Sequence, residues 1–242
     1  MFNLPLTIVV GLSMSIVPAI CTALAKKKMD EAQDMTRSVL RITTLFAMPC
    51  AVGFFTLSAP ILNVLYSEAD ASMLLQKLAF AVPFVALVSV SNSILQSYGK
   101  VYYPVINMLV GGVVKVVMNY MLIPVWGIDA APIATAVCYG IIATLNLVCI
   151  VCLLKIRLNV FDLFVKPACA AIVMGAVVVL FYNFASGFMP GSRLTTFAAI
   201  GVGALVYLIA ALLVRAIKKE DVLNMPKGEK LASLMTKLRL LK

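Results

Sequence analysis

The chain has 242 residues, of which 63% are hydrophobic and 12% are charged, and it carries a net charge of +10. Soluble globular proteins are about half apolar and about a quarter charged, so this composition excludes an ordinary soluble domain and indicates an integral membrane protein. The chain has no histidine, which excludes Ser–His and Cys–His catalysis, and its six cysteines lack the spacing of a zinc site.

Seven apolar segments are long enough to cross a bilayer as helices, which takes about 20 residues each. Membrane-spanning strands would be about half as long and would alternate in polarity, so helix is the interpretation that fits. We therefore expect an all-α integral membrane fold with about seven transmembrane helices, at residues 2–25, 42–66, 73–96, 105–125, 131–154, 167–185 and 194–214.

The first segment becomes hydrophobic at once and has no basic start of the kind that signal peptides carry, so we expect it to continue from earlier helices of a longer protein. Gly11, Ser15, Pro18 and Thr22 share one helical face. Pro18 removes a backbone donor and predicts a kink in this helix. Ser15 and Thr22 are candidates for a substrate pathway.

The next two segments also combine prolines with polar faces. Pro49 and Pro60 are expected to interrupt the second segment, and Pro83 precedes a face of the third that carries Ser89, Asn92 and Gln96. Interrupted helices are typical of transporters, in which freed backbone groups line a cavity. Asn92 therefore joins the candidate pathway residues.

The fourth segment contains a charge near the middle of a membrane-length apolar run. Asn107, Gly111, Lys115 and Asn119 recur at every fourth residue and form one stripe on a helix, and all four are candidates for the substrate pathway. A lysine at mid-membrane costs roughly 2.5–3.5 kcal/mol, so it faces protein or water. Lys115 is either a cation in a substrate pathway or a packing residue that bonds a neighbouring helix, and the glycines allow such a helix to approach.

The last two segments carry almost no hydrogen-bonding groups and predict peripheral helices or the walls of an apolar groove. Residues 215–242 place leucines at helical spacing among bases, which predicts an amphipathic helix on the anionic cytoplasmic leaflet, with a solvated tail as the alternative. We divide the chain into a helical lobe (1–154), a peripheral pair (155–214) and a basic tail (215–242).

Basic residues alternate between the connections. Every second connection, together with the tail, holds 17 of the 20 bases. The positive-inside rule then places the N-terminus outside and the C-terminus in the cytoplasm. The net charge thus follows from topology, and we expect no nucleic-acid partner.

Several stretches together resemble the fourteen-helix oligosaccharide flippases of the MATE-like superfamily. NLPLTIVVGLSMSIVPAICTALAKK is similar to their eighth helix, and APILNVLYS to the end of the ninth. NMLVGGVVKVVMNYMLIPVWGIDAAPIATAVCYG resembles their most typical segment, and EDVLNMPKGEKLASLMTKL resembles the close of the branch like stage V sporulation protein B and MurJ. The resemblance covers essentially the whole chain and implies helices eight to fourteen, the C-terminal half.

The resemblance implies a function in cell-envelope biosynthesis. Such proteins move sugars linked to undecaprenyl pyrophosphate, including peptidoglycan precursors, across the bacterial plasma membrane, using two lobes around a cationic cavity and a final helix pair that can hold the lipid tail. It implies membrane lipids and an N-terminal lobe, in the same or a separate chain, as partners, and no cofactor. Lys115 would then contact the anionic pyrophosphate, which is our own extension of the resemblance.

Three other functions stay open at this point. A cation-coupled multidrug exporter of the same superfamily often has acids in its cavity, and no acid lies within any predicted span here. A non-transporting membrane scaffold would make Lys115 purely structural. A membrane enzyme would use clustered acids or histidines, which the chain lacks, so we expect no catalytic residue.

Overall fold

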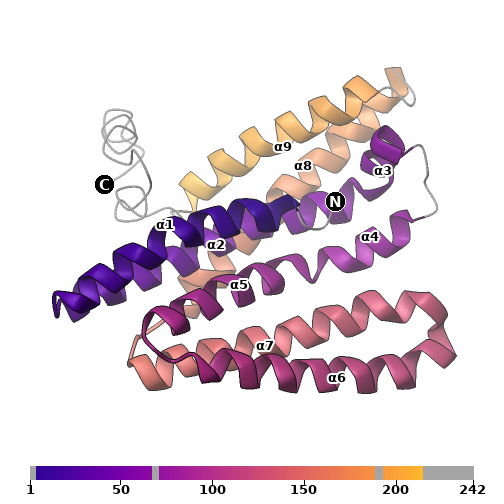
Figure 1. Cartoon of the computed structure of the whole chain (residues 1–242). Coiled ribbons are helices and arrows are strands. Elements are labelled where there is room, and N and C mark those ends of the chain that lie inside the picture. The colour runs from indigo at the N-terminus through magenta and orange to yellow at the C-terminus, as the bar shows by residue number, and fades with distance from the viewer. Residues whose placement is uncertain (1–3, 67–70, 189–192, 215–242) are drawn as a thin grey trace, which may run out of the picture.

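The structure is a computed structural model that describes residues 4–66, 71–188 and 193–214 (Figure 1). Within these ranges the chain is helical and contains no strand, as expected. The elements in chain order are α1 (Leu4–Ala25), α2 (Met29–Thr56), α3 (Ser58–Tyr66), α4 (Ser72–Ala79), α5 (Val82–Ser97), α6 (Tyr102–Trp126), the 3-10 turn η1 (Gly127–Asp129), α7 (Ala130–Leu154), the π turn η2 (Phe161–Val165), α8 (Lys166–Phe188) and α9 (Arg193–Leu213).

Four helical stretches of the described chain are long and apolar enough to cross a membrane, or five if the bent pair α4–α5 counts as one span. One of the four is the 53-residue stretch Tyr102–Leu154, in which α6 and α7 lie side by side and run in opposite directions (Figure 1). At 1.5 Å per residue a single straight helix of that length would far exceed a bilayer, so this antiparallel pair has the length for two crossings. The expected total of seven crossings remains a prediction.

The breaks in the helices differ from those expected at the prolines. Pro49 lies inside α2, which continues to Thr56, and the chain breaks at Leu57 instead. Pro60 lies in the first turn of α3, where its missing N–H has no helical partner to lose. The third predicted span is bent by 49° between α4 and α5, close to Pro83 at the start of α5. The expected interruption of the second span is therefore present, next to Pro60. A helix that continued past Thr56 would need the N–H of residue 60 for the Thr56 carbonyl, and proline has none, so Pro60 favours the break, whereas Pro49 does not interrupt α2. α1 continues through Pro18, and the kink expected there stays a prediction.

Two hydrophobic clusters form the core, and both include residues of α2 or pack against it. The first joins α1, α2, α5 and α7, with Leu40, Ile94 and Ile150 among its fully buried side chains. The second joins α8 and α9, with Val178 and Tyr207 buried, and packs against Val52 of α2. Helix α2 is thus the element that connects the α8–α9 pair to the rest of the bundle.

The α8–α9 pair packs tightly because glycines replace side chains at its contacts. A Cβ on Gly203 of α9 would lie 2.8 Å from Val178 of α8, and one on Gly175 of α8 would lie 2.5 Å from Val52 of α2. Small residues let membrane helices approach closely enough for dispersion contacts to hold them. Ile172, Leu180, Leu205 and Leu208 of the pair are exposed, and the expectation that these helices are peripheral stays a prediction.

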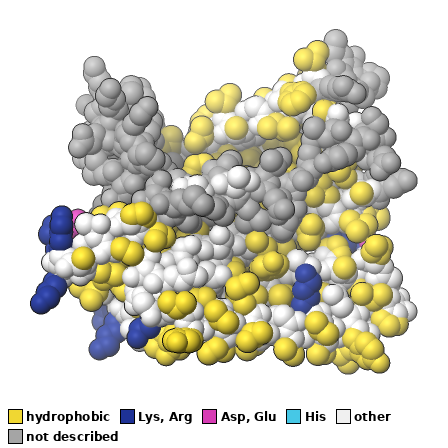
Figure 2. All heavy atoms as spheres, in the orientation of Figure 1, with side chains coloured by type: hydrophobic (Ala, Val, Ile, Leu, Met, Phe, Trp, Pro, Cys, Tyr) yellow, Lys and Arg dark blue, Asp and Glu magenta, His cyan; other side chains and the backbone are white. Residues whose placement is uncertain are grey.

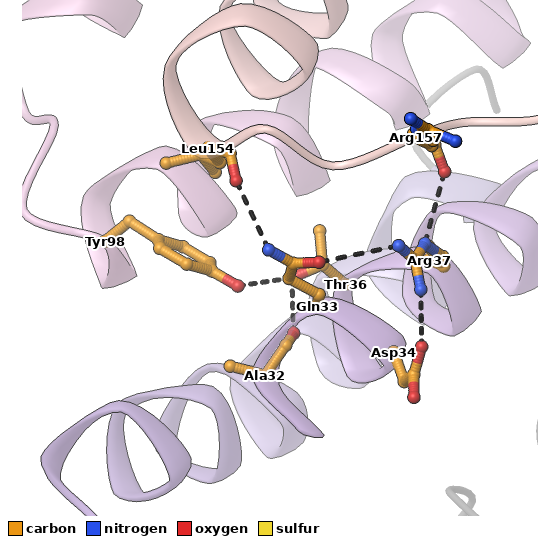
Figure 3. A network of polar contacts seen from close by, with 8 residues as sticks. All are labelled: Ala32, Gln33, Asp34, Thr36, Arg37, Tyr98, Leu154 and Arg157. Carbon is orange, nitrogen blue, oxygen red and sulfur yellow. Dashed lines mark hydrogen bonds and ion pairs between the residues drawn. The ribbon is translucent and has the colours of Figure 1, made fainter. Parts of the chain in front are cut away.

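Lys and Arg side chains gather at one end of the bundle (Figure 2), and a polar network fastens this end (Figure 3). The connections there carry the exposed bases Lys26, Lys27, Lys28, Lys100, Lys155 and Arg157. We call this the basic end. Arg37 of α2 pairs with Asp34 at 2.5 Å, and its Nε donates to the Arg157 carbonyl at 3.2 Å. Gln33 Nε2 donates to the Leu154 carbonyl at 3.5 Å, and the hydroxyls of Thr36 and Tyr98 are 3.3 Å apart. The start of α2 is thereby connected to the ends of α5 and α7.

An ion pair joins two distant elements among the described residues at the opposite end. Lys77 Nζ of α4 lies 3.0 Å from Asp129 Oδ2 of η1, and both side chains are more than a third exposed. This pair joins α4 to the turn between α6 and α7. The predicted amphipathic tail at 215–242 lies outside the described residues.

Candidate functional site

The stripe of Asn107, Gly111, Lys115 and Asn119 lies on α6, as the sequence predicted. Its first half faces α7, because Asn107 is 7% exposed and Gly111 is buried. Its second half, Lys115 and Asn119, is half-buried. The spacing of four residues advances slightly more than one turn at each step, so the stripe turns from the α7 contact toward the edge of that contact.

Three asparagines from three helices meet at the buried part of this stripe. Asn146 of α7 is fully buried, and its Nδ2 donates to Asn92 Oδ1 at 2.7 Å and to Ser91 Oγ at 2.9 Å on α5. Its Oδ1 accepts a hydrogen bond from Asn107 Nδ2 of α6 at 2.8 Å. Asn107 Nδ2 also lies 3.7 Å from Cys149 Sγ. We call this set the asparagine cluster.

The asparagine cluster gives two of the predicted pathway residues a structural partner. Asn92 and Asn107 share Asn146, and Asn92 Nδ2 also lies 3.6 Å from Met108 Sδ. A polar group in the hydrocarbon region needs a hydrogen-bonding partner, and here the partners come from neighbouring helices. The cluster therefore joins α5, α6 and α7 at one level of the bundle.

Gly111 lies one turn beyond the cluster and sets the spacing between α6 and α7. A Cβ at this position would be 2.3 Å from Cγ1 and 2.5 Å from Cδ1 of Ile142, and 3.3 Å from the Cys138 carbonyl oxygen. Only glycine fits at this distance without movement of Ile142. Gly112, the next residue, has nothing within 4 Å of such a Cβ. The interpretation of Gly111 as a close-approach residue agrees with this geometry.

Lys115 and Asn119 have unused polar atoms in the interior of the apolar run. Within the described ranges no carboxylate forms an ion pair with Lys115. The Oδ1 atom of Asn119 is buried and has no hydrogen-bond partner there. Figure 2 shows that hydrophobic side chains cover most of the face formed by α6 and α7. A cation and an orphan acceptor one turn apart can together bind an anion that also carries a donor.

The remaining surface of α6 is apolar. Val113, Val116 and Val117 are exposed, and they line a groove of about 660 Å³ along this helix together with Val105, Met108, Leu109 and Gly112. A surface of this kind suits lipid tails or apolar faces of other helices. Lys115 lies within the same stretch of α6, between Val113 and Val116.

The predicted polar face of α1 is only partly described. Pro18 and Thr22 are exposed, and the Thr22 hydroxyl donates to the Pro18 carbonyl of its own helix at 2.8 Å. The side chain of Ser15 lies outside the described residues. Neither Pro18 nor Thr22 contacts the asparagine cluster in the interactions that the structure describes.

Two side chains that bond between helices, Asn146 and Tyr207, were not predicted from the sequence. Asn146 is the one amide in the apolar helix Ala130–Leu154, and a single amide in such a run was a signal for an interhelical hydrogen bond. Tyr207 corrects the description of the last two segments as nearly free of hydrogen-bonding groups, because its hydroxyl bonds to a carbonyl of α2.

Comparison with known proteins identifies a family that matches most of the chain. The family model described as "Lipid II flippase MurJ" matches residues 1–199. Three similar proteins are from Bacillus subtilis (strain 168). They are the "Uncharacterized membrane protein YabM" (24% identical over 93% of this chain and 43% of the relative), stage V sporulation protein B (22%, 93% and 44%) and lipid II flippase MurJ (25%, 56% and 26%).

The fold also matches a solved structure. The inward closed conformation of lipid II flippase MurJ superposes with a TM-score of 0.69, with 18% sequence identity, over 86% of this chain and 44% of that one. The chain thus spans less than half the length of each of these relatives.

Proposed function

The chain belongs to the lipid II flippase MurJ family, and we propose that it forms part of a transporter that moves a lipid-linked sugar across the bacterial membrane. The observation that carries this proposal is the family match over residues 1–199, supported by a multi-pass helical fold like that of MurJ. The family consists of transporters rather than enzymes. A peptidoglycan precursor or a polysaccharide unit on undecaprenyl pyrophosphate is the substrate class that we propose.

In this proposal Lys115 contacts the anionic headgroup of the substrate. It lies in the interior of α6, is half-buried, and pairs with no carboxylate in the described part of the chain. In a medium of low dielectric constant a pyrophosphate would stabilise such a cation far more than in water. The orphan Oδ1 of Asn119 would accept a hydrogen bond from a hydroxyl or acetamido N–H of the same headgroup.

The other predicted pathway residues have different parts in this proposal. Asn92 and Asn107 are engaged in the asparagine cluster and would hold α6 at a defined rotation, so that Lys115 is presented to the substrate. Ser15 and Thr22 would line the pathway on α1. We keep them as weaker candidates, because the Thr22 hydroxyl is already bonded within its helix.

A second half would complete the transport site. The chain covers 43–44% of YabM and of stage V sporulation protein B, and 44% of the solved MurJ chain. Transporters of this kind place their substrate between two structurally related halves. We therefore propose an N-terminal lobe, in the same or in a separate polypeptide, as the partner of these helices.

The α8–α9 pair is proposed to contact the lipid tail of the substrate. Its outer side chains are apolar and exposed, and glycine contacts hold the two helices together. A long isoprenoid chain has no polar groups to satisfy, so a smooth apolar helix pair suits it without any specific hydrogen bond.

The proposed orientation places the basic end in the cytoplasm and the Lys77–Asp129 end outside. Single cysteines introduced in a cysteine-free variant test this orientation with a membrane-impermeant thiol reagent. Lys27→Cys at the basic end is expected to react only after permeabilisation, and Ile128→Cys in intact cells. Reaction of Lys27→Cys in intact cells would reverse the orientation.

The test of the proposed function is a transport assay with the complete two-lobe protein in vesicles that contain a lipid-linked sugar. Lys115→Ala is expected to lower the rate of translocation about tenfold or more at unchanged protein amount, since each tenfold corresponds to about 1.4 kcal/mol. Lys115→Arg keeps the charge and is expected to retain more activity. Lys100→Ala, an exposed lysine at the basic end, is the matched control.

The outcomes separate the alternatives. Equal loss of folded protein and transport in Lys115→Ala would mean that Lys115 is a packing residue. Full activity of Lys115→Ala would remove it from both roles. Absence of any translocation of lipid-linked sugars by the complete wild-type protein would refute the flippase proposal and favour a scaffold or an exporter of other substrates.

A further inference from the structure

A hydrogen bond in the second hydrophobic cluster joins α9 to α2. The Tyr207 hydroxyl of α9 donates to the backbone carbonyl of Leu45 in α2 at 2.6 Å, across 162 residues of sequence. Tyr207 is 6% exposed and lies among Ala170, Met174 and Ala211. The bond is short and partly buried among apolar side chains, so its loss would leave polar atoms in a largely apolar environment.

The Leu45 carbonyl, which accepts this bond, lacks its usual hydrogen-bond donor within α2. In an α-helix the carbonyl of residue 45 accepts a hydrogen bond from the N–H of residue 49. Residue 49 is Pro49, which has no N–H and lies inside the continuous helix Met29–Thr56. Pro49 therefore removes the helical donor of Leu45 without ending the helix, and Tyr207 supplies a donor from another helix.

We propose that Pro49 and Tyr207 act as a matched pair, in which the proline exposes a carbonyl and the tyrosine uses it to position the α8–α9 pair on α2. Tyr207 is thus a positioning residue for the apolar helix pair. This inference extends the proposed function, because that pair is the proposed surface for the lipid tail. The inference states that the contribution of Tyr207 depends on Pro49. This dependence holds whether or not the substrate is a lipid-linked sugar.

The apolar contacts of the α8–α9 pair cannot fix its position as a hydrogen bond can. Gly175 against Val52 and Gly203 against Val178 pack the pair through dispersion contacts, which are not directional and allow small sliding movements. A hydrogen bond to a fixed backbone carbonyl adds direction and defines one axial position of α9 along α2. Loss of Tyr207's hydroxyl should therefore widen the range of positions of α9 as well as lower stability.

The experiment is a double-mutant cycle on the whole chain in detergent micelles or vesicles, with Tyr207→Phe, Pro49→Ala and the combination. Tyr207→Phe in the native background is expected to lower the thermal midpoint by roughly 2–4 °C, because the Leu45 carbonyl loses its partner. In the Pro49→Ala background the N–H of residue 49 bonds that carbonyl, so the same change is expected to cost less than half as much. Tyr182→Phe, on α8, is the control and should behave alike in both backgrounds.

Two further readouts keep the proposal testable if Pro49→Ala folds poorly. The infrared band of an isotopically labelled Leu45 carbonyl is expected to shift to higher frequency in Tyr207→Phe, as a carbonyl does on losing a hydrogen bond. Spin labels at the exposed positions 46 on α2 and 208 on α9 are expected to give a broader distance distribution in that variant.

Three results would overturn the inference. These are an unchanged carbonyl band in Tyr207→Phe, an equal effect of Tyr207→Phe in both proline backgrounds, or an unchanged distance distribution. Any of these results is compatible with normal transport of lipid-linked sugars, which would refute this inference and leave the proposed function intact. Conversely, the Pro49–Tyr207 dependence can be observed in a protein that transports no lipid-linked sugar, so the two proposals are tested separately.

Discussion

Asn107 Nδ2 donates to Asn146 Oδ1 at 2.8 Å, and this bond connects α6 to α7 on the helix that also carries the interior lysine. Asn146 in turn donates to Asn92 and Ser91 of α5. One amide thus uses its nitrogen to donate to two side chains of α5 and its oxygen to accept from α6. A side chain with this many partners in a membrane interior is a structural centre whose removal affects three helices together.

Asn146→Ala is expected to destabilise the bundle by about 1–3 kcal/mol. Interhelical hydrogen bonds in membranes average about 0.6 kcal/mol each with a maximum near 1.7, and three are lost here. Thermal or denaturant unfolding in micelles measures the change. Asn183→Ala, an exposed asparagine on α8, should have little effect. Equal shifts for the two variants would contradict the importance of the asparagine cluster.

Gly111→Ala is expected to destabilise the protein by about 1–3 kcal/mol, because the new Cβ would lie 2.3 Å from Ile142 Cγ1 and force an overpacked contact. Gly112→Ala is the control on the neighbouring residue, where a Cβ meets nothing within 4 Å. In an Ile142→Ala background, which removes the atoms that clash, Gly111→Ala should cost less than it does in the native chain, although Ile142→Ala is itself destabilising because that side chain is buried. The unfolding midpoints of the native chain, the three single variants and the double variant measure this, and an equal cost in both backgrounds would mean that another contact dominates.

Breaking the Lys77–Asp129 ion pair is expected to have a small effect. Both side chains are more than a third exposed, and exposed pairs contribute about 0–1 kcal/mol because water and salt screen them. Lys77→Ala should therefore shift stability by less than Asn146→Ala, and the difference should shrink further in high salt. A large effect that is insensitive to salt would show that this end of the bundle is shielded from water.

Alkaline pH is expected to weaken the contact of α5 with α2 through Tyr98. Burial raises the pKa of the Tyr98 phenol above its ordinary value of 10, against the opposing effects of its hydrogen bond to Thr36 and of the charge on Arg37. A raised pKa means that the unfolded chain loses this proton first. The stability that the neutral phenol contributes is therefore complete below about pH 10 and is lost as the pH rises through the folded-state pKa.

Tyr98→Phe removes this titration, so its unfolding midpoint should depend less steeply on pH above about pH 10 than that of the native chain. Tyr102→Phe, at an exposed position that is 81% accessible, is the control for general alkaline effects. Parallel pH profiles for the native chain and Tyr98→Phe would show that the phenol contributes nothing in this range.

The sequence by itself determined the class of protein and which side chains share a face of each helix. Apolar runs of about 20 residues can satisfy their backbone in lipid only as helices, so the all-α fold followed directly. The four-residue spacing placed Asn107, Gly111, Lys115 and Asn119 on one stripe, and the structure keeps it. The close approach of another helix at Gly111 was likewise foreseen, because a glycine in such a stripe has that use.

Only the tertiary structure decided which residues meet across helices. Periodicity gives the angle of a side chain around its own axis, but it contains no information on the neighbour or on its axial position. Asn92 and Asn107 could each have faced a cavity, and Asn146, 39 residues after Asn107, turned out to bond both. Pro49 could be read as a helix breaker, whereas packing supplied Tyr207 from 162 residues beyond Leu45 to bond the carbonyl that the proline had freed.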